Sequence, residues 1–295
     1  MTHSDVDLPR IAFLHGDPGK ARNDNHQRLP EAFAAAGWAV EIMDHDSVRI
    51  TANQLCIGGR AADDFDLIWL LGFGRQVSFF DRMQLLKPVP AGRMVISVDG
   101  LIYLHGKHRW LQHMPETHTS SDCAYLLSRL SAGGRWVIKP TAGSYGRDVR
   151  ILAANAEGEA ELQALMQRDP DSYFMLQRYI PQIVDGEKRT LVAGGEIIAS
   201  YIRTPSGDFR ANVSLAANVD AAELSAEEHT LVAGIAAELA AFGVGFAAID
   251  TVYPYLMEVN VANPGGLGTL AELGNEDATA ATIGAICRWK GFEPI

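Results

Sequence analysis

Short apolar runs alternate with an amphipathic helix and polar loops through the first part of the chain. The runs that predict strands lie at 10–16, 38–43, 64–74 and 93–99, and Gly37 closes the helix before the second run. Strands that alternate with helices predict an α/β fold with a doubly wound parallel sheet. Ligands bind beyond the carboxyl ends of such strands. The loops 15–24 and 72–80 are therefore candidates for substrate contact.

The pattern changes after residue 100 and predicts an α+β arrangement with hairpins. We expect a hairpin over 189–203, with Gly194-Gly195 as its turn, and a strand pair over 245–262 that turns at Tyr253-Pro254. The segment 214–223 looks like a mobile loop. The other expected elements are helices at 106–114, 121–131 (capped by Ser121), 157–168 and 225–242, and strands at 136–140, 149–154 and 173–181.

Composition narrows the classes of function. With 295 residues the chain is long enough for two or three subdomains. Its net charge of −11 disfavours nucleic acid as a partner, because phosphate backbones need a basic surface. We expect no membrane association, because no apolar run reaches the length of a span and the N-terminus lacks the apolar core of a secretory signal. Three scattered cysteines, Cys56, Cys123 and Cys287, indicate reduced thiols in a cytoplasm.

The first candidate site is WVIKPTAGSYG, where Lys139 ends an apolar strand and a glycine-containing loop follows. Glycines let backbone N–H groups approach phosphate oxygens, and a partly buried lysine supplies charge. No G-K-[ST] opens a helix here, so this is no Walker loop. Taken alone, the pattern fits an ordinary tight turn with a surface lysine even better.

The second candidate site is MLQRYIPQIVDGEKRTLV, in which Gln177 and Tyr179 close a strand. A charged loop follows, and Arg189 begins the next apolar strand, where it could bind a phosphoryl group or an oxyanion. A solvated charged turn is the simpler interpretation of DGEK. The Gln-Arg-Tyr-Ile segment could equally read an adenine or be plain strand.

The third candidate site joins Asp250 to the strand YLMEVN. Glu258 and Asn260 point to one face because side chains two apart in a strand do so, and antiparallel pairing would bring Asp250 near them. Three hard oxygen ligands on adjacent strands suit Mg²⁺, and clustered carboxylates without a cation would repel. The alternative is a half-exposed strand whose polar face meets water.

The order of these motifs resembles that of the ATP-grasp ligases, and among them the prokaryotic glutathione synthetases. The matching phrases are GKHRWLQHMPETHTS, WVIKPTAGSYG, FMLQRYIPQIVDGEKRTLVAGGE and GFAAIDTVYPYLMEVNVANPGG. They cover about the last two thirds of the chain. The resemblance implies an ATP-grasp fold in three parts: an N-terminal parallel-sheet subdomain over 1–115, a lid over 116–185, and a C-terminal subdomain with the metal site over 186–295.

The resemblance also implies a role for individual residues. Arg189 would stabilise an acyl phosphate and share the catalytic work with Lys139. The metal ligands would be Asp250, Glu258 and Asn260. The nucleotide would contact Lys107, Lys139, Gly143, Ser144, Tyr145, Gly146, Gln177, Arg178, Tyr179, Ile180, Glu187 and Asn212.

The implied reaction is an ATP- and Mg²⁺-dependent (or Mn²⁺-dependent) carboxylate–amine ligation through an acyl phosphate. Joining glycine to γ-glutamylcysteine is the default, and family members are usually homo-oligomers. No Ser–His or Cys–His nucleophile is required. We therefore expect His105, His108 and His113 to be helix-surface residues.

The acceptor region departs from the family pattern. Glutathione synthetases carry a basic Arg-Lys-Asp-Pro-Pro phrase where this chain has LLGFGRQVSFF, and a Ser-Pro-Thr phrase where it has NPGGLG. The residues expected at the substrates are Arg75, Arg203, Asn263, Gly265 and Gly266. Three alternatives follow: a peptide or amino-acid ligase with other substrates, a non-catalytic nucleotide-binding homologue, and a kinase that stops at a phosphorylated product.

Overall fold

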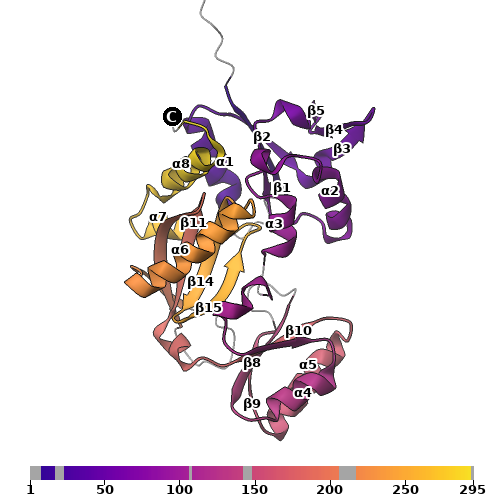
Figure 1. Cartoon of the computed structure of the whole chain (residues 1–295), viewed down its shortest axis with the longest axis vertical. Coiled ribbons are helices and arrows are strands. Elements are labelled where there is room, and N and C mark those ends of the chain that lie inside the picture. Colours follow the sequence, from indigo (N-terminus) through magenta and orange to yellow (C-terminus); the bar gives the residue numbers. More distant parts are fainter. Residues whose placement is uncertain (1–7, 17–22, 106–107, 142–147, 206–216, 294–295) are drawn as a thin grey trace, which may run out of the picture.

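The computed structural model describes residues 8–16, 23–105, 108–141, 148–205 and 217–293. Figure 1 shows a sheet with its helices formed by the N-terminal residues (indigo), the C-terminal sheet beside it (orange and yellow), and at the far end a third sheet with two helices, which we call the small sheet. In the described part of the chain, no helix is both long and apolar enough to cross a bilayer.

The N-terminal sheet has three parallel strands in the order β2-β1-β6, which confirms the parallel layer. They are β1 (Arg10–His15), β2 (Ala39–Asp44) and β6 (Leu67–Leu71). Helix α1 (Asn25–Ala35) joins the first two, and Gly37 follows it at φ 79°, as its place at a helix end predicts. Beside the parallel sheet lies a three-stranded antiparallel sheet, which the sequence did not reveal. It comprises β3 (Val48–Thr51), β4 (Gln54–Ile57) and β5 (Arg60–Ala61).

The fourth strand expected over 93–99 is wrong. Only a single bridge, Ile68 to Met94, extends the sheet. The reason is a helix cap: the Ser97 hydroxyl accepts a hydrogen bond from the backbone N–H of Gly100, which starts α3 (Val98–Tyr103). Helix α2 (Phe79–Leu86) packs against β3, beside the parallel sheet (Figure 1).

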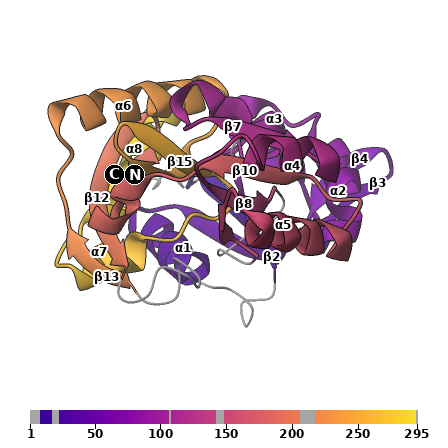
Figure 2. The ribbon, with the colours of Figure 1, turned by 90° about the horizontal axis from the view of Figure 1, so that it is seen from below.

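The small sheet is antiparallel, in the order β7-β10-β8-β9. Two helices, α4 and α5, pack against each other on this sheet, well apart from α6 (Ala226–Ala241) of the C-terminal part (Figure 2). Helix α4 is capped by Asp122 rather than Ser121, because the Asp122 carboxylate accepts from the N–H groups of Ala124 and Tyr125. The bounds are β7 (Thr117–Ser120), α4 (Cys123–Leu130), β8 (Arg135–Pro140), β9 (Arg150–Ala153), α5 (Ala156–Arg168) and β10 (Phe174–Arg178).

The C-terminal sheet has five antiparallel strands in the order β13-β12-β11-β14-β15. Both expected strand pairs are confirmed, whereas 214–223 is not a loop throughout, because Ala217–Ala221 pairs with β12. The bounds are β11 (Glu187–Ala193), β12 (Glu196–Pro205), β13 (Ala217–Ala221), α6 (Ala226–Ala241), β14 (Phe246–Val252), β15 (Tyr255–Asn260), α7 (Leu267–Glu272) and α8 (Ala278–Lys290).

The Gly194-Gly195 turn lies between α8 and α6, which both pack on β11 and β12. A Cβ on Gly194 would lie 2.4 Å from the Ala285 carbonyl oxygen, and one on Gly195 would lie 3.2 Å from the Ala240 Cβ. Both glycines also have positive φ (55° and 87°), which side chains disfavour. The turn therefore requires glycine for space as well as for backbone conformation.

Two apolar cores hold these layers together. One runs without interruption from the N-terminal sheet (Phe13, Trp69) into the C-terminal sheet (Phe246, Ile249). The other lies inside the small sheet, around Trp136. The segment expected as a helix over 106–114 is described from His108 and forms 3₁₀ turns over His108–His113 that kink at Trp110, whose side chain is buried in the first core.

Candidate functional site

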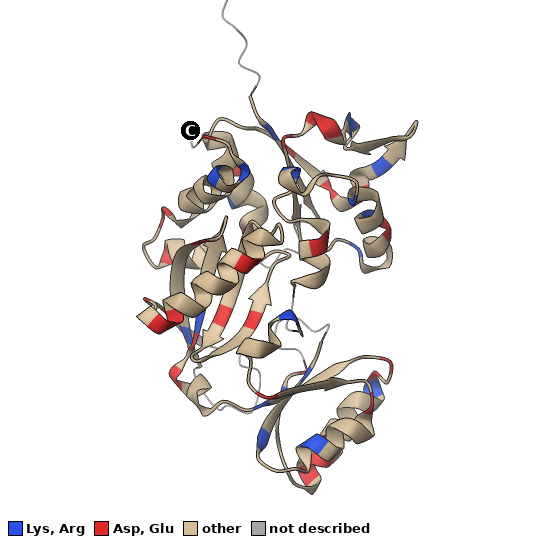
Figure 3. Cartoon of the chain, viewed as in Figure 1, with Lys and Arg blue, Asp and Glu red and all other residues tan. Residues whose placement is uncertain are grey.

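Charged side chains from three neighbouring strands meet on the C-terminal sheet. In the register Asp250 on β14 lies opposite Arg189 on β11 and opposite Glu258 on β15. Figure 3 shows the acidic residues of β14 and β15 side by side (red). Asp250 is 1% exposed and lies on a strand whose other residues are apolar or threonine. Its charge therefore has to be balanced by groups within the protein.

Two arginines answer the charge of Asp250. Arg189 donates from Nε to Oδ1 at 2.7 Å and from Nη2 to Oδ2 at 2.6 Å, a two-pronged contact. Arg203 on β12 lies 3.2 Å from the same Oδ2 and also pairs with Glu187. Asn260 donates from Nδ2 to Asp250 Oδ2 at 3.3 Å. We call these residues the Asp250 cluster: Glu187, Arg189, Arg203, Asp250, Glu258 and Asn260.

The cluster sets the pKa values of its acids in opposite directions. Burial and the neighbouring Asp250 carboxylate raise the pKa of Glu187 to about 6; Arg203 and Arg189 oppose this rise, and Glu258 adds to it. Burial alone would raise the pKa of Asp250, but Arg189 and Arg203 outweigh it and lower that pKa. The cluster thus holds three acids against two guanidinium groups, and it would accept a further positive charge.

A divalent cation fits this set of donors only if Asp250 shares its oxygens between the cation and its present hydrogen-bond partners. Carboxylates and an amide oxygen are the hard donors that Mg²⁺ prefers, and Asp250, Glu258 and Asn260 are brought together as the sequence predicts. Within the described ranges no group of three or more His, Cys, Asp or Glu side chains forms a metal site. A cation here would therefore rely on Asn260 and compete with Arg189 for Asp250. The metal assignment stays a prediction.

The segment 261–266, which follows β15, is fixed from three sides. The Arg189 Nη1 donates to the Gly265 carbonyl at 3.3 Å, which joins the segment to the Asp250 cluster. From α1, Asn25 donates from Nδ2 to Asn263 Oδ1 and to the Pro264 carbonyl, both at 2.8 Å. From the end of β6, the Gly72 N–H donates to the Ala262 carbonyl at 2.8 Å. Asn263, Gly265 and Gly266 thus lie where the N-terminal and C-terminal sheets meet.

His105 is a residue of this junction that sequence reasoning misplaced. It is half-buried, and its Nδ1 accepts from the Val261 N–H at 3.3 Å. Its ring lies 4.8 Å from that of Phe73, centroid to centroid. It follows α3 and precedes the 3₁₀ helix, so helical spacing gave no signal for this contact. His108 is exposed, as expected for a surface residue.

The loop 72–80 carries the one predicted substrate arginine of the N-terminal layer. Arg75 is 77% exposed and its Nε lies 3.0 Å from Asp46 Oδ2. Beneath it, the buried Arg82 donates to the carbonyls of Phe73 (2.6 Å) and Arg75 (3.1 Å), which fixes the path of the loop. The sequence gave no sign that Arg82 is buried, because its charged neighbour in α2, Asp81, is exposed.

Lys139 and Gln177 lie together inside the small sheet. The Lys139 Nζ donates to Gln177 Oε1 at 3.0 Å, and Gln177 Nε2 donates to Thr117 Oγ1 at 2.9 Å. Gln177 is 2% exposed, so its side-chain amide is fixed in place and orients the Lys139 ammonium group through their hydrogen bond. Thr117 had not been singled out in the sequence.

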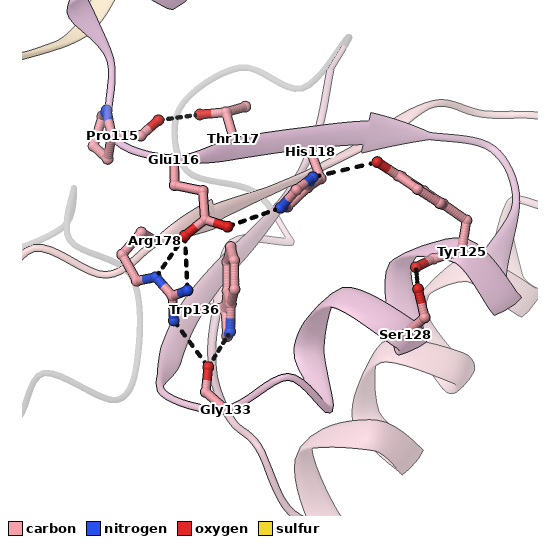
Figure 4. A network of polar contacts seen from close by, with 9 residues as sticks. All are labelled: Pro115, Glu116, Thr117, His118, Tyr125, Ser128, Gly133, Trp136 and Arg178. Carbon is pink, nitrogen blue, oxygen red and sulfur yellow. Dashed lines mark hydrogen bonds and ion pairs between the residues drawn. The ribbon is translucent and has the colours of Figure 1, made fainter.

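Arg178 serves the small sheet itself. Its guanidinium lies 3.7 Å from the centroid of the Trp136 ring and donates to Glu116 Oε2 at 2.7 Å and to the Gly133 carbonyl (Figure 4). This contact ties β10 to β7 and to the turn before β8. Because its side chain is engaged in this way, a contact of Arg178 with a nucleotide would be made by its backbone, and that contact stays a prediction.

The remaining predicted nucleotide residues divide into two groups. Tyr179 stacks with Arg135, whose guanidinium carbon is 4.2 Å from the ring centroid, and Ile180 is buried. The others lie outside the described residues: Lys107, Gly143, Ser144, Tyr145, Gly146 and Asn212.

Comparison with known families matches residues 106–275 to the model for the prokaryotic glutathione synthetase ATP-grasp domain. Among individual proteins, the chain is 31% identical over 179 residues to the glutathione synthetase of Parasynechococcus marenigrum (strain WH8102), covering 60% of this chain and 58% of that protein. It is 29% identical over 198 residues to that of Synechococcus elongatus, covering 66% of this chain and 61% of the relative. The chain thus matches less than two thirds of the length of these relatives.

Solved structures extend the likeness over nearly the whole chain. D-cycloserine synthetase DcsG superposes with a TM-score of 0.69 at 17% identity, over 95% of this chain and 99% of that one. The ATP-grasp ligase PsnB, complexed with a minimal precursor, gives 0.66 at 16% identity, over 95% and 100%. At such identities the likeness concerns the fold, which is the ATP-grasp fold, including the N-terminal sheet.

Proposed function

The chain belongs to the prokaryotic glutathione synthetase family of ATP-grasp domains, and we propose that it is an ATP-dependent carboxylate–amine ligase. The Asp250 cluster carries this proposal: a buried guanidinium, bonded through two nitrogens to Asp250, lies beside three acids on neighbouring strands of one sheet. With a divalent cation held by the acids, such a site would stabilise phosphoryl charge rather than supply a nucleophile.

The proposed reaction has two steps. A carboxylate oxygen of the acid attacks the γ-phosphorus of ATP, the bond from that phosphorus to the β–γ bridging oxygen breaks, and ADP leaves. The amine nitrogen then attacks the acyl carbon, phosphate leaves with the carbon–oxygen electrons, and the nitrogen gives up one proton. The protein's share is to orient the reactants and to stabilise charge.

Three groups of the chain have distinct tasks in this scheme. Arg189 stabilises negative charge on the transferred phosphoryl group, since it already sits between Asp250 and the Gly265 carbonyl. Lys139, oriented by Gln177, neutralises nucleotide phosphates. Glu258 and Asn260, with Asp250, would hold Mg²⁺ or Mn²⁺, which when bound neutralises phosphate oxygens.

The test is ADP release from Mg-ATP with γ-glutamylcysteine and glycine, each component left out in turn, with products identified by mass. Release that requires both co-substrates, together with the mass of glutathione, would establish the glutathione synthetase reaction that the relatives' names suggest. Release with hydroxylamine and other acids, but not with γ-glutamylcysteine, would establish a ligase with other substrates.

Two outcomes would contradict ligation. ADP release that yields a stable phosphorylated acid even when an amine is present would identify a kinase. Tight ATP binding without ADP release, across acids and amines, would identify a non-catalytic nucleotide-binding protein.

A further inference from the structure

The loop 72–80, whose last two residues begin α2, presents exposed apolar side chains beside the proposed reaction site. Phe73 is 36% exposed, Val77 92% and Phe80 67%. The rings of Phe73 and Phe79, and those of Phe79 and Phe80, are each 5.5 Å apart between centroids, so they form one cluster. Single exposed apolar residues are common on protein surfaces, but a contiguous group usually marks a binding site.

This apolar surface is joined directly to the segment that leaves the Asp250 cluster. Gly72 donates to Ala262, two residues past Asn260, and a chain advances by about 3.3 Å per residue in extended form. His105 bridges the two parts, with its ring against Phe73 and its Nδ1 accepting from Val261. A molecule whose carboxylate reacts at the Asp250 cluster could therefore extend a side chain onto the loop.

The described charged and polar groups around the loop hold one another. The Arg75 Nε lies 3.0 Å from Asp46 Oδ2, and Arg82 is buried under the loop with its guanidinium on backbone carbonyls. On the opposite side of the segment, Asn23 and Asn25 donate to the Asn263–Pro264 stretch. Among the described residues of the loop, the side chains left for a substrate are therefore mainly apolar.

We propose that the acid substrate of this ligase carries an aromatic or large aliphatic side chain, which packs on Phe73 and Phe80. The proposal rests on the ligase function and specifies its substrate class. It sets the acid apart from γ-glutamylcysteine, whose glutamyl end bears a further carboxylate and an ammonium group. An apolar side chain would be removed from water by the rings, which favours its binding.

The experiment uses the full chain with Mg-ATP and hydroxylamine as the amine, so that an activated acid is converted to its hydroxamate, measured by mass beside ADP. The acids are L-phenylalanine, L-leucine, L-glutamate and γ-glutamylcysteine. We expect kcat/KM for L-phenylalanine or L-leucine to exceed that for both acidic substrates by about 10-fold or more, the factor that burial of an apolar side chain provides.

Variants locate the preference. Phe73→Ala and Phe80→Ala should lower kcat/KM for L-phenylalanine by about 10-fold and that for L-glutamate by much less. Phe242→Ala is the matched control, because Phe242 is 50% exposed at the end of α6, where its ring contacts Arg109. It should change neither value.

Two results would overturn the inference, and they differ. If L-glutamate or γ-glutamylcysteine is the better substrate, or if Phe73→Ala and Phe80→Ala affect all acids equally, the ligase stands and the apolar substrate class is wrong. If no acid gives ADP and hydroxamate, the proposed function itself fails and this inference with it.

Discussion

The Asp250 cluster and the loop 72–80 both bond to the segment 261–266, yet they are built in opposite ways. The cluster buries several charges from neighbouring strands and balances them against one another. The loop exposes apolar rings and keeps its buried polar groups, His45 and Arg82, underneath. The difference indicates a division of labour: the charged region is suited to phosphoryl transfer, and the apolar region to recognition of the substrate.

The largest effect on stability should come from opening the Asp250 cluster. Arg189→Met leaves the 2% exposed Asp250 side chain with Arg203 and Asn260 only. Removal of one partner from a buried ion pair costs about 3–5 kcal/mol of unfolding free energy. Urea unfolding at neutral pH measures the loss.

The control for this variant is Arg288→Met, which removes the exposed pair with Glu196. Exposed pairs contribute little, because solvent screens them, so we expect no resolvable change in the urea midpoint. Equal losses in the two variants would contradict the view that burial makes the cluster special.

The next effect belongs to His45, beneath the loop. Burial lowers the pKa of His45 from 6.5 to about 4, although its hydrogen bond to the Leu71 carbonyl opposes this. The unfolded chain therefore takes up the proton first as pH falls, and stability is lost between pH 6.5 and 4. The free energy of unfolding lost over this range is about 3 kcal/mol. Urea unfolding at several pH values, compared between the protein and His45→Asn, should show this loss only when His45 is present.

The smallest effect has the opposite sign and belongs to Glu187 in the cluster. Its pKa is raised from 4.5 to about 6, so the folded protein keeps the proton longer than the unfolded chain does. Its contribution to stability is present below pH 4.5 and is lost as pH rises to 6, by about 2 kcal/mol. Glu187→Gln should remove this loss in the same unfolding series. A loss in the same direction as that of His45 would refute the contrast between the two regions.

The part of the site that sequence reasoning could predict follows from strand register. Asp250, Glu258 and Asn260 come together because side chains two apart share a face and antiparallel strands align them. The apolar run of β6 and the glycine turn of β11 and β12 were predictable for the same kind of local reason.

The parts that failed depend on contacts from distant segments or on competing local signals. His105 joins the site through Val261, which is 156 residues further along the chain. The run 93–99 has the apolar pattern of a strand, but Ser97 within it caps a helix. Asp122 rather than Ser121 caps the next helix, because its carboxylate accepts from two N–H groups. No periodicity in the sequence encodes such contacts.

The most direct test of the central claim is ADP formation from Mg-ATP, hydroxylamine and the acid that the protein uses best, measured for the protein and for Glu258→Gln. The amide keeps the size of the side chain but removes one negative charge from the cluster. We expect the variant to fold with an unchanged thermal midpoint and to lose turnover by about 10³-fold, since charge stabilisation at such a site contributes that much. Turnover at the full rate in Glu258→Gln would contradict the assignment of the Asp250 cluster as the reaction site.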